Sequence, residues 1–112
     1  MTDLTKLIER VEAGDIPSKF DPVFERALYR EGEDMVTRVY VASQAYNGSV
    51  DAALALKAEL VPEWLVENIS EFEGVWLVKL PYRYGGHLIE DPSLARALLL
   101  AILKAYKWEQ EQ

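Results

Sequence analysis

Apolar residues recur at helical spacing close to the start of the chain, which predicts a helix over about residues 3–13. Four of them take the i, i+3, i+4 and i+7 positions of one helix face: Leu4, Leu7, Ile8 and Val11. Thr2 or Asp3 can cap the start, because a short polar side chain accepts a hydrogen bond from a free backbone N–H. Gly14 stands where many helices end in the left-handed conformation.

A second apolar stripe predicts a helix over about residues 22–31. Its members are Val23, Phe24, Ala27 and Leu28. Asp21 can cap this helix, and Pro22 suits the first helical position, where its missing N–H leaves no bond unmade. Gly32 is expected to end it.

Residues 35–42, MVTRVYVA, are rich in β-branched side chains and predict a strand. In a strand, Val36, Arg38 and Tyr40 would face one way and the residues between them the other. The signals that break regular structure are weak at both ends, so a helix is the alternative.

The stretch AYNGSVDAALALKAEL predicts a helix that ends before Pro62. Asn47-Gly48 marks a turn, and Ser49 can cap the helix that follows. Asp51 then lies in the first turn, where a negative charge is favourable against the helix dipole.

Two further stretches, WLVENIS and GVWLVKLPY, predict two strands joined by the short loop EFEG. The pattern is that of a hairpin, although the loop lacks a signature two-residue turn. Apolar residues run without a break from Val75 to Val78, which favours burial of the second strand on both faces. A third short strand is predicted through residues 87–89.

The last stretch, DPSLARALLLAILKAYKW, predicts a helix that runs to about residue 107. Asp91 can cap it, and Pro92 takes the first helical position. Arg96 is the one polar residue between Leu94 and Leu103, so the helix should be buried between other elements. The tail EQEQ, residues 109–112, is expected to fray.

These elements predict one domain over residues 1–112, since 112 residues are the size of a single domain. Helices together with a few strands pack as a single small β-sheet covered by helices. The predicted fold class is therefore α/β, of the α+β kind. The expected architecture is an alpha-beta-alpha sandwich, in three layers or in the simpler two.

The chain carries 12 basic and 19 acidic residues, a net charge of −7. A field of that sign repels the phosphates of nucleic acids and anionic lipid headgroups. The longest apolar run, residues 97–103, is far shorter than the roughly 18 residues of a membrane span, and the N-terminus is unlike a signal peptide. We expect a cytoplasmic protein that binds neither nucleic acid nor membrane directly.

Sequence motifs of catalysis and of cofactor binding are absent. With no cysteine and one histidine, the chain cannot build a disulfide framework, a thiolate zinc site or a multi-histidine metal site. It has no phosphate-binding loop, dinucleotide fingerprint, zinc-protease motif or hydrolase motif. The neighbouring carboxylates of Glu90 and Asp91 are better explained by the start of the last helix than by acid–base chemistry. We expect no enzymatic activity, no cofactor and no metal.

One candidate binding site lies in the sequence YRYGGH. The side chains of Tyr82, Arg83, Tyr84 and His87 could converge on an anionic or planar ligand, and the glycine pair would let the backbone approach closely. The alternative is a connector in which the tyrosines flank a sheet edge, the glycines turn the chain and the histidine is half exposed.

A second candidate is an acidic stretch with no lysine or arginine among its charges. Its glutamates are Glu59, Glu63, Glu67, Glu71 and Glu73. On a strand, Glu67 and Glu71 would share a face with Leu65 and Ile69. The last four glutamates, with these apolar neighbours, could dock a basic partner or imitate a run of phosphates. The alternative is a solvated hairpin whose charges discourage aggregation at a sheet edge.

Three blocks of the chain carry a family resemblance: LTKLIERVEAGDIPSKFDPVFERAL, YNGSVDAALALKAELVPEW and EDPSLARALLLAILKAY. In the middle block a tyrosine and a Ser-x-Asp-Ala-Ala run lead to Val-Pro and a tryptophan. These blocks resemble the phage ABA-sandwich domain family, small phage and prophage proteins with a sheet layered between helices. The resemblance implies no catalytic residues. It implies a phage or prophage origin and an accessory role in an infected bacterial cell.

The expected function is therefore non-enzymatic: a phage or prophage accessory protein that binds a host or defence-system protein through an acidic surface. The partner would be basic, and the place of action would be the cytoplasm of an infected or lysogenic bacterial cell. Two alternatives stay open. One is a binding protein or sponge for a small, nucleotide-like ligand, and the other is a structural module that assembles with itself as a homo-oligomer.

Overall fold

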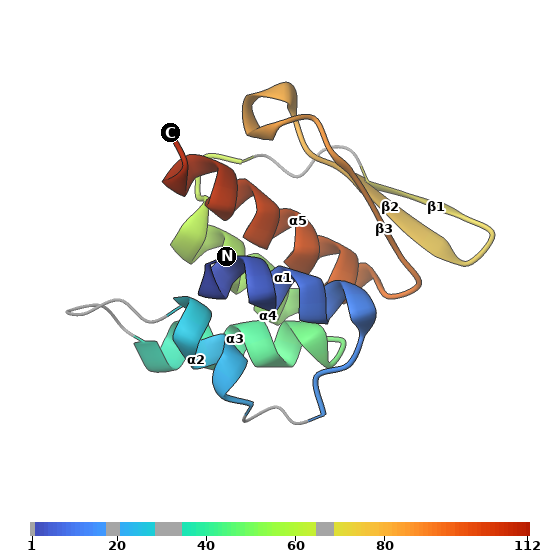
Figure 1. The fold of residues 1–112 in the computed structure, drawn as a ribbon. Helices are drawn as coiled ribbons and strands as arrows, with labels where there is room; N and C mark the ends of the chain where they lie inside the picture. The colour runs from blue at the N-terminus through green and yellow to red at the C-terminus, as the bar shows by residue number, and fades with distance from the viewer. Residues whose placement is uncertain (1, 18–20, 29–34, 65–68) are drawn as a thin grey trace.

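The computed structural model describes residues 2–17, 21–28, 35–64 and 69–112. Within these ranges the chain forms five α-helices, one 3₁₀ helix and a three-stranded sheet (Figure 1). In chain order the elements are α1 Asp3–Ala13, α2 Pro22–Leu28, α3 Met35–Tyr46, α4 Val50–Leu60, β1 Ile69–Phe72, β2 Val75–Lys79, η1 Tyr82–Tyr84, β3 Leu88–Asp91 and α5 Leu94–Gln110.

The predicted ends of α1 and α4 are confirmed. The side chain of Thr2 accepts a hydrogen bond from the Thr5 backbone N–H at 3.1 Å and so caps α1. Gly14 ends α1 with φ of 68°. Ser49 caps α4 in the same way, by accepting from the Ala52 N–H at 3.1 Å. Both helices therefore start and stop where short local signals place them.

The start of α2 is also confirmed, because the Asp21 carboxylate accepts a hydrogen bond from the Val23 N–H at 2.9 Å. The guanidinium of Arg10 lies 3.2 Å from the same carboxylate and ties α1 to the start of α2. These contacts hold the pKa of Asp21 below its usual value, the Val23 N–H being the larger cause. The predicted end of this helix, at Gly32, lies outside the described residues.

The prediction of a strand over residues 35–42 is wrong, because the segment belongs to helix α3. Alternation suited a strand only as far as Val41, whereas Ala42, Ala45 and Tyr46 continue at helical spacing and are all buried. A β-branched residue lowers the stability of a helix by less than about 1 kcal/mol relative to alanine. The packing of α3 therefore overrides the strand preference of these residues.

Helix α5 begins two residues later than predicted. Its N-cap is Ser93, whose side chain accepts from the Arg96 N–H at 3.3 Å. Asp91 was the predicted cap, but it ends strand β3 and its carboxylate accepts from the Ser93 N–H at 2.8 Å. Pro92 therefore lies between the strand and the cap. At its other end α5 continues to Gln110, into the tail predicted to fray.

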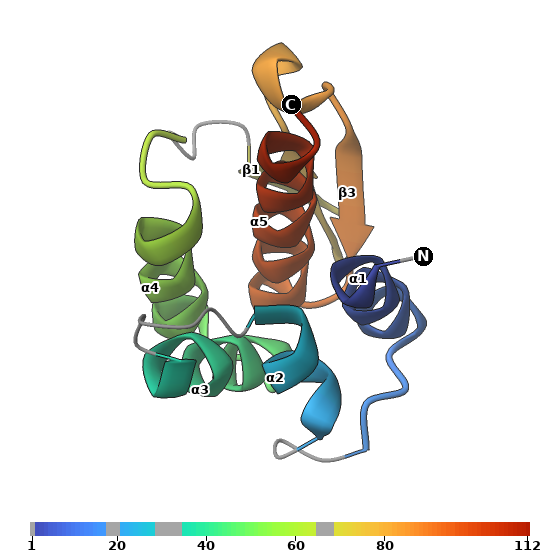
Figure 2. The same ribbon diagram turned by 60° about the vertical axis from the view of Figure 1, so that its left-hand side comes forward.

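Burial of α5 on nearly all sides is confirmed. It packs against α1, α3 and α4 on one side and against β2 and β3 on the other. Figure 2 shows it between α1 and α4, with the sheet behind. Its most deeply buried side chains include Leu98, Leu99, Ile102 and Leu103. No described helix combines the length and the apolar character that crossing a membrane requires.

Arg96, the polar exception in this helix, holds three parts of the fold together. Its Nε–H donates to the carbonyl oxygen of Tyr46 at 2.9 Å, and its guanidinium lies 4.2 Å from the centre of the Tyr46 ring. The Tyr46 hydroxyl in turn accepts from the Ile16 N–H at 3.1 Å. The segment after α1, the end of α3 and the start of α5 are thus joined through Tyr46.

The sheet is antiparallel with the strand order β1-β2-β3. Phe72 pairs with Val75, so only Glu73 and Gly74 form the turn between β1 and β2. Both have positive φ, 51° and 83°, as a type I′ hairpin turn requires. The expectation of a loop without a signature turn is therefore wrong. The first residues of the predicted WLVENIS strand, 65–68, lie outside the described residues.

One face of the sheet packs against α5. Ile69, Val78 and Ile89 lie side by side on this inner face. Val75 and Leu77 point the other way and are only half-buried, so the prediction that β2 is buried on both faces is wrong.

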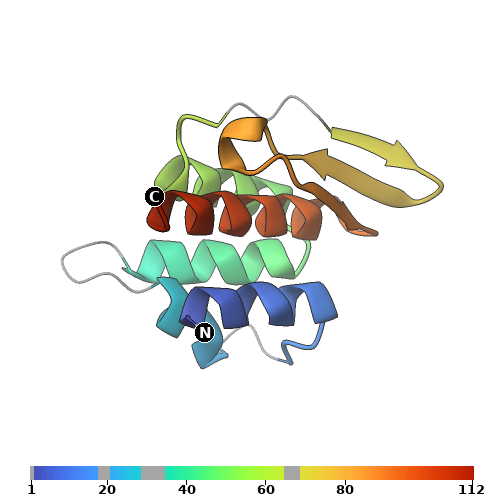
Figure 3. The ribbon, with the colours of Figure 1, turned by 45° about the horizontal axis from the view of Figure 1, so that its top comes forward.

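The predicted fold class, one small sheet packed against helices, is confirmed. The described helices all lie on one side of the sheet, and a second helical layer is not present among them (Figure 1). Figure 3 shows the β1–β2 hairpin projecting beyond the helices.

The central position of α5 predicts a large cost for truncating it. Leu99→Ala should lower the free energy of unfolding by about 2–5 kcal/mol, because Leu99 is fully buried and a cavity would remain. Leu54→Ala in α4 is the matched control: Leu54 is 43% exposed, so its change should stay within about 0.5 kcal/mol. Urea denaturation measures both, and equal losses would contradict the placement of α5.

Candidate protein-binding surface

The face of the sheet turned away from α5 carries apolar side chains that no described element covers. We call it the outer sheet face, defined by Phe72, Val75, Leu77 and Leu88. Phe72 is 66% exposed and Leu88 is 55% exposed, while the other two are half-buried. A cluster of exposed apolar residues on one face often marks a site of protein–protein contact.

Charged residues surround this apolar surface and are mainly acidic. Glu90 faces outward beside Leu77, and Glu73 lies in the turn next to Phe72. Glu71 precedes Phe72 in β1 and is exposed, but its side chain points to the opposite face, the one that carries Ile69. The one lysine on this face is Lys79, opposite Leu88. The outer sheet face therefore has an apolar centre and a rim of net negative charge.

The structure separates the glutamates that the sequence grouped together. Glu71 and Glu73 flank Phe72 at the hairpin tip. Glu63 is near the other end of β2, where its carboxylate lies 2.9 Å from the Arg83 guanidinium. Glu67 lies outside the described residues. Of these described glutamates, only Glu73 adjoins the outer sheet face, because Glu71 shares the inner face with Ile69 and Glu63 is distant.

Sequence reasoning missed the apolar residues of this surface. The unbroken apolar run from Val75 to Val78 indicates burial on both faces, whereas only Val78 is fully buried. The usable signal was the pair of residues Glu73-Gly74, because Gly tolerates the positive φ of a tight turn. Placing the turn there fixes the register and turns Phe72 outward with Val75 and Leu77.

The residues of the YRYGGH candidate do not converge on one point. Tyr82 is 93% exposed, whereas Tyr84 is 1% exposed and lies beneath Arg83, whose guanidinium is 5.2 Å from its ring centre. Gly85 has φ of 94°, and a Cβ there would come within 2.8 Å of the His87 imidazole. The glycine therefore allows the histidine to fold back against the turn.

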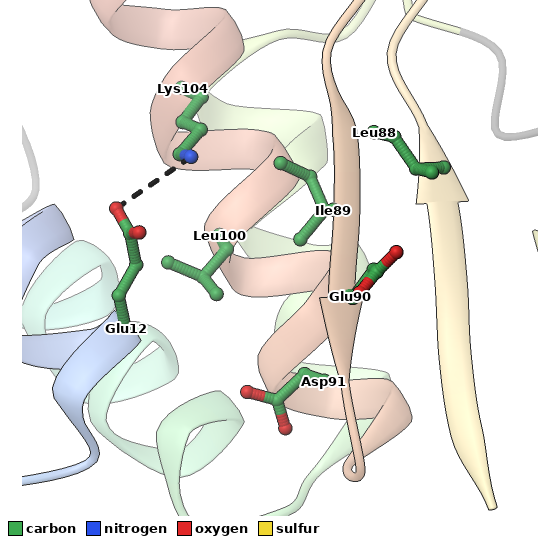
Figure 4. A pocket seen from close by; sticks show the side chains of 7 residues that line it. All are labelled: Glu12, Leu88, Ile89, Glu90, Asp91, Leu100 and Lys104. Atoms are coloured by element: carbon green, nitrogen blue, oxygen red, sulfur yellow. Dashed lines mark ion pairs between the residues drawn. The ribbon is translucent and has the colours of Figure 1, made fainter.

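A groove runs between α1 and β3, with α5 as its floor. We call it the α1–β3 groove; it consists of two adjoining hollows of about 240 and 350 Å³ that share Glu12 and Lys104. The Lys104 ammonium lies 3.6 Å from the Glu12 carboxylate (Figure 4). His87 and Trp108 line the larger hollow. His87 is the one residue of the YRYGGH candidate that lines either hollow.

The pKa of Tyr84 is raised above its usual value. Burial is the main cause, and the nearby negative charge of Glu109 adds to it, while Arg83 acts in the opposite direction. The Tyr84 hydroxyl has no hydrogen-bond partner within bonding distance among the described residues. A buried hydroxyl without a hydrogen-bond partner lowers the stability of the folded state.

The described part of the chain holds no group of three or more side chains suited to bind a metal ion. Comparison with protein-family models, with curated proteins and with solved structures gave no match. The resemblance to the phage ABA-sandwich domain family therefore stays a prediction.

The buried hydroxyl of Tyr84 predicts a change at alkaline pH. A raised pKa in the folded state means that stability is intact below about pH 10, the usual tyrosine pKa, and falls as pH rises through the higher folded value. Tyr84→Phe should remove this component and leave stability at neutral pH unchanged or higher. Urea denaturation across the alkaline range measures it.

The control is Tyr82→Phe, because Tyr82 is almost fully exposed. This variant should keep the alkaline profile of the unmodified protein. A loss of more than about 1 kcal/mol in Tyr84→Phe at neutral pH would mean that its hydroxyl makes a stabilising hydrogen bond.

Proposed function

We propose that this protein is a non-enzymatic binding module that docks a basic protein partner on its outer sheet face. The observation that carries the proposal is the exposure of Phe72 in a paired strand, at 66%, beside three further apolar residues. Aromatic side chains of this kind often dominate the energy of protein interfaces.

The arrangement of charge supports a basic partner. Interfaces commonly have an apolar centre that excludes water and a polar rim that orients the partner. Here Glu73 and Glu90 supply an acidic rim against Lys79, and the whole chain has a net charge of −7. Opposite charge on the partner would speed association and favour the correct orientation.

The biological setting extends the proposal and rests on the family resemblance together with the charge. We place the protein in the cytoplasm of an infected or lysogenic bacterial cell, as a phage or prophage accessory protein. Its partner would be a host or defence-system protein with a basic surface. Such a surface often binds nucleic acid, so an acidic protein that covers it would block that activity.

The small-ligand alternative has less support. Of its four residues only His87 lines a described hollow, Tyr82 points into solvent and Arg83 is paired with Glu63. The self-assembly alternative would use the same outer sheet face, since a second copy could cover it. Two copies would bring the same acidic rims together, which disfavours that contact.

Removing the exposed aromatic side chain should abolish partner capture. Phe72→Ser should weaken binding about 30-fold or more, the loss expected for an interface anchor worth 2 kcal/mol or more. The unmodified protein and the variant are immobilised separately, and bacterial lysate is passed over both at low salt.

Leu54→Ser is the control for this experiment, since Leu54 is also an exposed apolar residue but lies on α4. A partner held by the unmodified protein and by Leu54→Ser, but not by Phe72→Ser, supports the outer sheet face. Equal retention on all three columns would contradict it. A stable dimer of the protein alone in sedimentation, lost in Phe72→Ser, would assign the face to a second copy.

Charge reversal tests the acidic rim separately. Glu73→Lys and Glu90→Lys together should slow association with the captured partner about tenfold at low salt, and raising the salt concentration should reduce the difference. Glu25→Lys in α2, far from the sheet, should leave association unchanged. Surface plasmon resonance gives the association and dissociation rates. If each rim substitution made singly slows association no more than Glu25→Lys does, only net charge matters.

A further inference from the structure

Strand β3 is an edge strand of the described sheet, and its free edge lies along the α1–β3 groove. In the order β1-β2-β3, it pairs with β2 on one side and with no described strand on the other. An edge strand presents backbone N–H and C=O groups that another extended chain can pair with.

The register identifies which groups face the groove. The Leu80 N–H donates to the His87 carbonyl at 2.8 Å, so these two residues form a hydrogen-bonded pair. Bonded pairs alternate along an antiparallel ladder, which makes Val78–Ile89 the next one. Leu88 and Glu90 belong to the non-hydrogen-bonded pairs that alternate with these bonded pairs. Their N–H and C=O groups therefore point away from β2, toward the free edge.

The lining of the groove agrees with this assignment. Leu88 and Glu90 line the smaller hollow although their side chains point away from it, as Figure 4 shows, so their backbones form this wall. Leu100 and Lys104 of α5 lie at the floor, and Glu12 of α1 stands on the opposite side. An extended segment in the groove would thus meet free backbone groups along one side.

The charge of the groove selects the chemistry of that segment. Four carboxylates line the two hollows against two lysines: Glu9, Glu12, Asp91 and Glu111. Both lysines are already paired, Lys104 with Glu12 at 3.6 Å and Lys107 with Glu111 at 2.8 Å. The excess of negative charge favours a basic segment and disfavours an acidic one.

We propose that the α1–β3 groove binds an extended basic peptide segment as a fourth strand, paired with the free edge of β3. This inference rests on the proposed function, since the partner on the outer sheet face would supply the segment. Main-chain hydrogen bonds provide affinity in this mode of binding, and side chains at alternate positions provide specificity. Alternate side chains of the added strand would extend the outer sheet face beyond Leu88.

The test uses an end-blocked heptapeptide of alternating lysine and valine as the probe, with the intact protein labelled for NMR. Binding should slow amide hydrogen exchange at Leu88 and Glu90, whose N–H groups face the edge, relative to the free protein. Methylation of the peptide nitrogens on its pairing edge should weaken binding about tenfold or more, because it removes the donors and leaves the charge. Replacing lysine by glutamate in the peptide should have an effect at least as large.

Equal affinity for the methylated and unmethylated peptides would overturn strand pairing. Equal affinity for the lysine and glutamate peptides would overturn recognition of basic charge, and absence of binding by the lysine peptide at low salt would overturn the proposal as a whole. The peptide controls need no change in the protein, so they remain decisive if a variant fails to fold.

Two variants separate the backbone of β3 from its side chains. Leu88→Pro removes an outward N–H, a change that an edge strand tolerates, and should weaken peptide binding about tenfold. Leu88→Ala keeps that N–H and should retain most of the affinity. Phe72→Ser should bind the peptide normally. If the lysine peptide does not bind but partner capture still depends on Phe72, the edge site is rejected and the proposed function stands. If the peptide binds but partner capture does not depend on Phe72, the proposed function is rejected and the edge site stands.

Discussion

The burial of α5 is the constraint on which the rest of the structure depends. A helix with apolar residues around its whole circumference is stable in water only when other elements surround it. Here α1, α3 and α4 cover one side and the inner face of the sheet covers the other. The sheet is therefore present as a cover for α5, and Val78 and Ile89 are buried because they contact this helix. Arg96 fits this environment because its donor reaches the end of α3 at Tyr46.

The same constraint explains why the outer sheet face is open. Helices α1, α3 and α4 surround α5, and α2 packs against α1 and α3, so no described helix covers the second face of the sheet. A strand in such a sheet exposes every other side chain, and polar residues normally take those positions. Phe72, Val75, Leu77 and Leu88 break that rule together. A departure from local consistency that is concentrated on one surface is typical of a functional site rather than of the fold.

Features governed by a few neighbouring residues could be predicted from the sequence, and features that depend on distant contacts could not. Thr2, Gly14 and Ser49 act within one helical turn, so the ends of α1 and α4 were predictable. Residues 35–42 failed because their strand preference is weaker than the packing of α3 against α2, α4 and α5. The arrangement of the YRYGGH side chains was unpredictable for a similar reason: Tyr82 and Tyr84, two residues apart in sequence, point into solvent and into the core. The ion pair between Glu63 and Arg83 connects the acidic stretch with the YRYGGH segment, which are two separate candidate sites in the sequence.

The free edge of β3 invites pairing with other chains, and the acidic charge around it opposes that pairing. An unpaired strand edge beside an exposed apolar face invites association with any extended chain, including another copy of the same protein. Carboxylates at Glu90 and Asp91, and across the groove at Glu12, oppose self-association because each copy brings the same sign of charge. The opposition disappears when the incoming chain is basic. Charges that keep the free protein from pairing with itself would therefore also select the partner, and no further specificity element is required at this edge.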